Sequence, residues 1–142
     1  MANVTPVFIP GLLCTEWLFH GQADIASDTA VFADTRQHDT ITGMAEAALA
    51  QTSGQLVPIG LSMGGYVALE MARLAPARIS ALSLFISNCR QDNDAQRDYR
   101  EHTIKLAQSR GFRGVTRKFL GKFLSPQALT CLLYTSDAAD DL

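Results

Sequence analysis

The chain has 142 residues, of which 47% are hydrophobic, and its formal net charge is -2. This size suits one domain or part of one, and the charge balance gives no reason to expect a nucleic-acid partner. No apolar stretch reaches the length of a membrane span and no secretory signal is recognisable, so we expect a cytoplasmic protein without a membrane partner.

Apolar runs and helical periodicities alternate along the first 86 residues. Short runs rich in β-branched residues predict strands, and apolar residues three and four positions apart predict helices. In chain order, the expected elements are a strand at 4–9, a helix at about 16–26 with Trp17 and Leu18 on its apolar face, a strand at 30–33, a helix capped by Asp39 that ends near 53–54, a strand at 56–59, a helix that stops at Pro76, and a strand at 79–86 buried on both faces. This alternation predicts the α/β class, with a parallel sheet covered by helices on both sides.

The character of the sequence changes after residue 88. Residues 92–110 are highly charged with apolar residues at helical spacing, and residues 111–124 form a second amphipathic stretch, so two helices are expected outside the sheet pattern. We divide the chain into a core part at 1–89, a helical insertion at 90–130 and a tail at 131–142. The tail follows neither pattern and resembles translated sequencing adapter, so we expect it to be non-native and the natural gene to continue.

The most informative stretch is residues 56–75, where an apolar run enters Gly60-Leu61-Ser62-Met63-Gly64 and continues as an amphipathic segment. This strand, turn and helix frame is what a G-x-S-x-G nucleophile elbow requires. Strand and helix crowd together at such a turn, and Gly60 and Gly64 supply the necessary space. We expect the Ser62 hydroxyl to stand above the carboxyl edge of the sheet, beside the first N–H groups of the helix.

Two other glycine-rich motifs are excluded by the same residues. Gly60 and Gly65 have the spacing of a phosphate-binding loop, but Tyr66 stands where a lysine would contact the phosphates. A dinucleotide-binding fingerprint would need a glycine in place of Ser62.

No metal or organic cofactor is expected. The three cysteines are widely spaced and suit neither a disulfide framework nor a metal cluster. They are Cys14, Cys89 and Cys131. Nothing beside Cys14 in the sequence would activate its thiol, so we interpret it as a packing residue.

Through PVFIPGLLC at residues 6–14 and IGLSMGGYVALEMA at residues 59–72, the chain resembles the α/β-hydrolase superfamily. The resemblance implies a partial parallel α/β-hydrolase sheet of about four strands with flanking helices, and the start of a helical cap. It also implies that Ser62 is the nucleophile and that the backbone N–H groups of Met63 and Leu12 bind the oxyanion.

The implied activity is that of a serine hydrolase acting on a small-molecule acyl substrate, an ester, thioester or related compound. We expect Leu13 and Trp17 to contact this substrate. In the family, the triad acid and histidine follow two further strands, and both are absent from this chain, which is therefore expected to be an inactive fragment.

The histidines and the carboxylate that could replace the missing residues have other interpretations. His102 is the only histidine after Ser62, and a position on the cap or the surface explains it as well as a general base does. His20 and His38 precede the nucleophile and are no better candidates for the general base than His102. Asp34 follows the second predicted strand, where a carboxylate typically serves loop hydrogen bonds.

Other functions stay open. The same fold supports acyl transfer, carbon–carbon bond hydrolysis and cofactor-free peroxidation. A non-catalytic module that binds a small ligand and an interaction fragment without a pocket are rivals from other classes. The strand at 79–86 would lack a neighbour, and we expect such an apolar sheet edge to favour self-association.

Overall fold

The computed structural model describes residues 4–22, 28–88, 90–110, 121, 124–128 and 130. The chain divides into two compact units, residues 1–91 and 92–142. Cys89, Cys131, most of the amphipathic segment at 111–124 and the tail at 131–142 lie outside the described residues. The expectations for the tail and for the second helix of the insertion therefore stay predictions.

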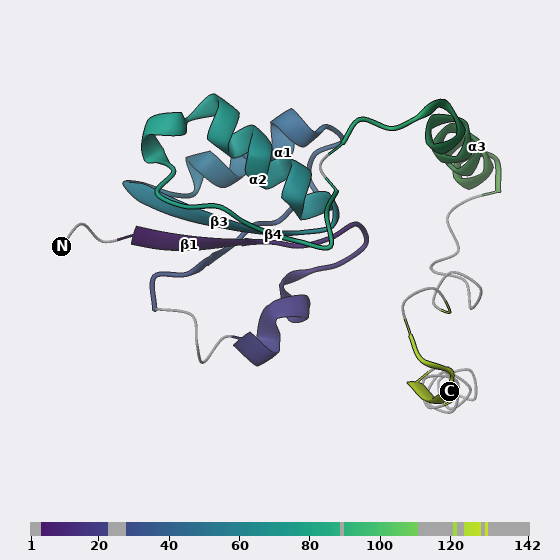
Figure 1. Cartoon of the computed structure of the whole chain (residues 1–142), viewed down its shortest axis with the longest axis horizontal. Coiled ribbons are helices and arrows are strands. Elements are labelled where there is room, and N and C mark those ends of the chain that lie inside the picture. Colours follow the sequence, from purple (N-terminus) through teal and green to yellow (C-terminus); the bar gives the residue numbers. More distant parts are fainter. Residues whose placement is uncertain are drawn as a thin grey trace. The chain divides into compact units, whose positions relative to one another are not determined.

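The first unit contains a four-stranded parallel sheet with the strand order β2-β1-β3-β4 (Figure 1). Its strands are β1 (Val4–Ile9), β2 (Val31–Phe32), β3 (Gln55–Leu61) and β4 (Ser83–Phe85). The register pairs Ile9 with Gly60, and Leu61 with Phe85, so the carboxyl ends of β1, β3 and β4 meet at one edge. The predicted parallel α/β sheet is confirmed.

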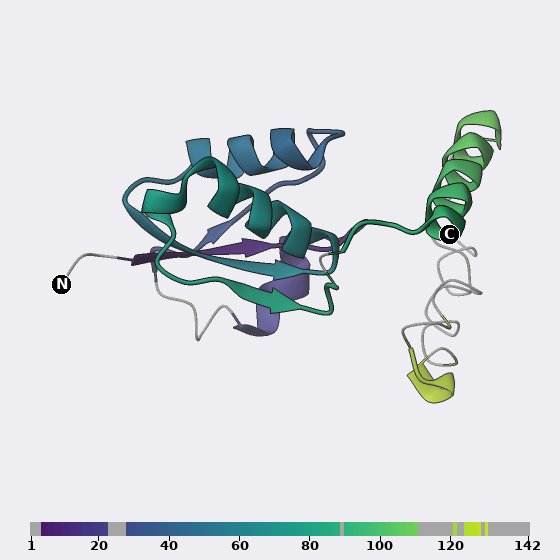
Figure 2. The same ribbon diagram turned by 45° about the horizontal axis from the view of Figure 1, so that its top comes forward.

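Helices cover both faces of this sheet (Figures 1 and 2). The 3₁₀ helix η1 (Glu16–Gln22) lies on one face, and α1 (Ile41–Ala50) and α2 (Met63–Leu74) lie on the other. The connection from β1 leads through η1 to β2, whereas the connection from β3 leads through α2 to β4 on the opposite side. Because right-handed crossovers in opposite directions use opposite faces, β1 and β3 flank the topological switch point, where open α/β sheets bind ligands.

The main core lies between the sheet and the two helices α1 and α2. It is built from small and medium apolar side chains: Val7, Ile9, Ala33, Ala45, Ala48, Leu56, Val67, Ala68 and Met71. Successive side chains of a strand alternate between faces, so Phe8 lies on the η1 side. There its ring packs against Phe19 and Phe32, with centroid separations of 5.1 and 5.2 Å.

The helix expected at about 16–26 is described only as the 3₁₀ helix η1, and its buried face differs from the prediction. Phe19 is its buried residue, whereas Trp17 is 73% exposed and Leu18 is also exposed. A 3₁₀ helix has three residues per turn, so a pattern read at 3.6 residues per turn assigns the wrong side chains to the sheet. Residues 23–27 of the predicted helix lie outside the described residues.

The last strand is shorter and more exposed than the sequence predicted. Only Ser83–Phe85 forms β4, while Pro76–Arg78 forms the 3₁₀ helix η2 and Ile79 makes an isolated bridge to Leu56. Leu84 and Phe85 are exposed, so the predicted burial on both faces is wrong. The reason is position, because β4 is at the edge of the sheet in the described part of the chain.

Thr40, rather than the predicted Asp39, caps α1. Its Oγ1 accepts a hydrogen bond from the Gly43 N–H at 3.0 Å, which satisfies one of the amides left unpaired at a helix start. Two residues later, Thr42 Oγ1 donates to Glu70 Oε1 at 2.7 Å and joins α1 to α2. Glu70 also accepts from Arg73 Nε and Arg73 Nη2, each at 2.7 Å.

This junction predicts a pH dependence of stability. The hydrogen bonds from Arg73, and next that from Thr42, lower the pKa of Glu70 from 4.5 to about 2. A carboxylate with a lowered folded-state pKa stabilises the fold above its unfolded-state pKa, and that contribution is lost as the pH falls toward the folded-state value. We therefore expect Glu70→Gln to lower the Tm at neutral pH and to flatten its decline between pH 4.5 and 2, measured by thermal melts.

Glu46→Gln is the matched control, because Glu46 is an exposed glutamate on α1. It should leave the acid decline of the Tm as in the wild type. The same decline in Glu70→Gln and in the wild type would contradict the assignment.

In the second unit, α3 (Asp94–Arg110) confirms the helix predicted at 92–110. His102 lies on this helix and is exposed. None of the helices in the described ranges combines the length and the apolar character needed to cross a membrane.

Candidate active site

Ser62 occupies a strained turn between β3 and α2. Its backbone angles are φ 53° and ψ -112°, and its side chain is exposed. A residue with a Cβ rarely adopts such angles and does so where the surrounding structure fixes them. Here the Ser62 N–H donates to the Phe85 carbonyl at 2.8 Å, and the Ser62 carbonyl accepts from the Gly65 N–H at 3.0 Å. The sharp turn expected from the motif is present.

The two glycines of the motif allow strand and helix to approach. A Cβ on Gly60 would overlap the carbonyl oxygen of Gly64 and would lie 2.7 Å from Cα of Gly65. A Cβ on Gly64 would overlap the carbonyl oxygen of Ile9 and would lie 2.8 Å from that of Pro10. The expected need for small residues two before and two after Ser62 is confirmed.

The loop after β1 lies beside Ser62. A Cβ on Gly11 would be only 3.5 Å from Cβ of Ser62. The next residues form a tight turn, in which the Cys14 N–H donates to the Gly11 carbonyl at 3.1 Å and Leu13 has φ 62°. Leu12 and Leu13 are both exposed at this turn. The structure thus brings Gly11 close to Ser62, and Leu12 and Leu13 follow it in the same turn; their roles stay predictions.

Met63 is the first residue of α2. The N–H groups of the first helical turn have no acceptor within the helix, and the helix dipole favours negative charge at this end. The Met63 amide therefore lies where an anion next to Ser62 would be stabilised. Its role as an oxyanion donor, like that of the Leu12 amide, stays a prediction.

Each histidine of the first unit has a contact of its own. The ring of His20 stacks on that of Trp17, with centroids 4.7 Å apart and an interplanar angle of 13°. His38 lies beside the start of α1, where its Nδ1 would be 3.3 Å from a Cβ on Gly43. Neither contact involves Ser62, and His102 belongs to the second unit.

Asp34 has the loop role that the sequence favoured. Its carboxylate accepts from the backbone N–H of Arg36 at 3.0 Å and from Arg36 Nε and Nη2 at 2.8 and 3.0 Å. These bonds, the side-chain bonds first, lower the pKa of Asp34 from 3.8 to about 2. A carboxylate so strongly held in its charged form is a poor proton acceptor, which supports a structural role.

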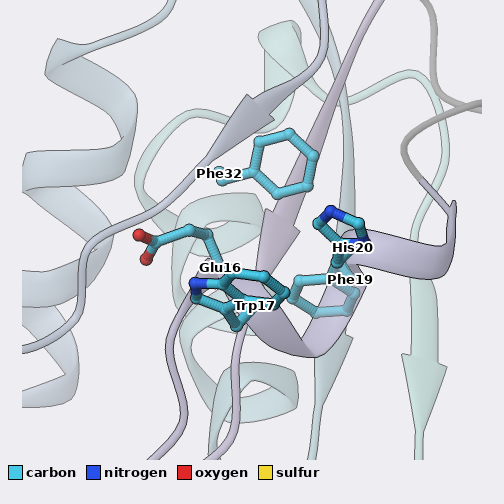
Figure 3. A pocket seen from close by; sticks show the side chains of 5 residues that line it. All are labelled: Glu16, Trp17, Phe19, His20 and Phe32. Carbon is cyan, nitrogen blue, oxygen red and sulfur yellow. The ribbon is translucent and has the colours of Figure 1, made fainter.

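A depression of about 190 Å³ lies next to η1, and its lining is mainly aromatic (Figure 3). The lining residues are Glu16, Trp17, Phe19, His20 and Phe32. Ser62 is not one of them, and the expected contact of Trp17 with a substrate stays a prediction. Within the described residues, no cluster of histidine, cysteine and carboxylate side chains is arranged to hold a metal ion.

Comparison with known proteins identifies the fold. Neither a protein-family model nor a curated protein matches the sequence. A solved structure described as a marine microorganism esterase is similar, with a TM-score of 0.55 and 17% sequence identity. The chain has a partial α/β-hydrolase-like fold. The match covers 92% of this chain and 58% of the esterase, so the chain spans 58% of that structure's length.

In this hydrolase-like fold, one residue beside Ser62 was missed by sequence reasoning. Ile86 directly follows Phe85, whose carbonyl binds the Ser62 amide, and it has φ 51°. No sequence pattern indicates it, because an isoleucine at the end of an apolar run is typical of an ordinary strand residue.

Proposed function

We propose that Ser62 is the nucleophile of an acyl hydrolase that acts on an ester, thioester or related acyl substrate. The observation that carries the proposal is the strained, exposed position of Ser62 at the switch point of the sheet, between the Gly11 loop and the start of α2. The fold likeness to an esterase supports a hydrolase in general. The choice of Ser62 comes from its geometry.

In the proposed reaction, Ser62 Oγ attacks the carbonyl carbon of the substrate, and the N–H groups of Met63 and Leu12 bind the resulting oxyanion. The carbon–oxygen or carbon–sulfur bond to the leaving group then breaks, and the alcohol or thiol departs with the proton lost by Ser62. Water later cleaves the acyl–serine ester, which releases the acid and returns a proton to Ser62. Loss of one oxyanion donor typically lowers the rate by about 10² to 10³. We assign the general base to no residue of the first unit, since His20 stacks on Trp17 and His38 lies beside the start of α1.

A thiol at position 62 tests the site without a general base, because a helix N-terminus lowers the pKa of a cysteine and yields the reactive thiolate. In a variant with the three native cysteines replaced by alanine, we expect Ser62→Cys to react with p-nitrophenyl acetate in a single burst of one p-nitrophenolate per chain. The thiolate displaces p-nitrophenolate and forms a thioester. We expect the rate at pH 7 to exceed that of the same variant unfolded in urea by about tenfold.

Ser53→Cys in the same background is the control, since Ser53 is an exposed serine remote from the carboxyl edge of the sheet. Equal burst rates for the two variants would overturn the proposed site. Rapid alkylation of the thiol at position 62 by iodoacetamide, without acylation by the ester, would favour a binding module over an acyl-transfer site.

A further inference from the structure

The described residues include three non-glycine residues with positive φ, namely Leu13, Ser62 and Ile86. All three follow the carboxyl ends of neighbouring strands, β1, β3 and β4. Positive φ is uncommon for residues with a side chain and is an outlier for a β-branched residue such as isoleucine. Strain of this kind concentrates at active sites and ligand clamps.

Leu13 and Ile86 lie on opposite sides of Ser62. On one side, Gly11 approaches Ser62 to 3.5 Å, measured from the Cβ that Gly11 lacks, and Leu13 is two residues further along the same turn. On the other side, the Phe85 carbonyl accepts from the Ser62 N–H at 2.8 Å, and Ile86 is bonded directly to that carbonyl. The strands that precede these two residues, β1 and β4, are two strand spacings apart, about 10 Å.

Both side chains are apolar and exposed, Leu13 at 56% and Ile86 at 85%. The strained backbone costs free energy, and so does the exposure of the apolar side chain to water. At Leu13 and Ile86, burial of the side chain offsets neither of these two costs. An apolar ligand bound at Ser62 would cover these side chains and offset both costs.

We propose that Leu13 and Ile86 form the two sides of an apolar binding surface around Ser62, which selects esters with a medium-length alkyl chain over acetyl esters. The proposal rests on the proposed function for its chemistry. The binding surface itself is testable without any reaction. Ile86 is a specificity-determining residue in this assignment, and Ser62 remains the reacting group.

The first test is methyl NMR of the 142-residue chain titrated with methyl octanoate or methyl acetate. We expect the methyl signals of Ile86 and Leu13 to shift with the octanoate at concentrations at which the acetate has no effect. Ile104, an exposed isoleucine on α3, is the control and should shift with neither ester. An unmoved Ile86 signal, or equal shifts of Ile86 and Ile104, would overturn the proposal.

A second explanation for a shifted Ile86 signal is self-association of the chain, which is tested by varying the protein concentration. If the Ile86 signal moves with protein concentration and not with methyl octanoate, this residue belongs to a contact between copies along the β4 edge, and the ester surface is wrong. Shifts of Ile86 and Leu13 that depend on methyl octanoate and not on protein concentration support the binding surface.

The second test is Ile86→Gly in the Ser62→Cys background, because glycine tolerates φ 51° and removes the side chain. We expect acylation by p-nitrophenyl octanoate to fall by about tenfold, acylation by p-nitrophenyl acetate to stay within about twofold, and the Tm not to fall. Ile104→Ala should leave both rates unchanged.

A fall of both rates together with the Tm would show a structural role for Ile86 and overturn its role in specificity. The two proposals also fail separately. If neither ester acylates the thiol at position 62 while methyl octanoate still shifts Ile86, the nucleophile assignment is wrong and the binding surface is supported.

Discussion

Gly64→Ala is expected to lower the unfolding free energy of the first unit by about 3 kcal/mol or more, although alanine is a better helix residue than glycine by about 1 kcal/mol. The added Cβ would overlap the carbonyl oxygen of Ile9 and approach that of Pro10 to 2.8 Å. These are backbone atoms, and Ile9 is paired in register with Gly60, so neither can move without separating β1 from β3. Thermal melts should show a decrease in Tm of more than about 10 °C.

Gly21→Ala is the matched control for this substitution. Gly21 belongs to η1, and a Cβ built there has no neighbour within 4 Å. Its Tm should stay close to that of the wild type. A Gly64→Ala variant as stable as Gly21→Ala would mean that the close approach of α2 to the end of β1 is not present in solution.

Ser62→Gly is expected to raise the Tm. Backbone strain of this kind costs about 1–3 kcal/mol, and a glycine would remove it. The greater flexibility of glycine in the unfolded chain costs about 0.5–1 kcal/mol, which leaves a net gain of about 1 kcal/mol, or about 4–8 °C for a unit of this size. The Ser62 side chain is exposed, so little packing is lost with it.

Two further variants isolate the strain at position 62. Ser62→Ala retains a Cβ and should not show the gain in Tm. Ser53→Gly changes an exposed serine outside the positive-φ residues and should slightly lower the Tm. If Ser62→Gly and Ser53→Gly shift the Tm alike, position 62 stores no strain. The expected gain would show that stability has been given up to hold a hydroxyl at this turn.

The parts of the fold that could be predicted from the sequence depend on neighbours along the chain. β1 has the predicted bounds, because the β-rich run of six residues is ended directly by Pro10-Gly11. The turn at Ser62 was predictable because Gly60 and Gly64, within five residues, indicate that strand and helix pack too closely for a side chain at either position.

The parts that could not be predicted depend on the sheet as a whole. The run at 79–86 has the composition of a buried strand, but burial depends on which strands lie beside it, and β4 is at the edge. Which side chains of η1 are buried against the sheet depends on its 3₁₀ geometry. At this length, composition does not distinguish a 3₁₀ helix from an α-helix. Thr40 and Asp39 are both good capping residues, and the contact with Gly43 decides between them.

The candidate site divides in the same way. A local motif identified Ser62 and Met63, and the loop after β1 supplied Leu12 and Leu13. The approach of Gly11 to Ser62 and the position of Ile86 beside it follow from strand pairing, which the sequence does not state. Trp17 stacks on His20 and lines the aromatic depression beside η1, and its contact with a substrate stays a prediction.

The pairing of Ile9 with Gly60 has a consequence for how such a chain can vary in evolution. The backbone pairing of β1 with β3 sets the separation of Gly11 from Ser62. Insertions in the turn at 51–54, at the far end of the sheet, therefore leave this separation unchanged. One residue added inside β1 or β3 would displace the loop by about 3.3 Å and turn the inward side chains outward. Homologous chains should therefore differ in length at the amino edge and keep a constant count of residues along these two strands.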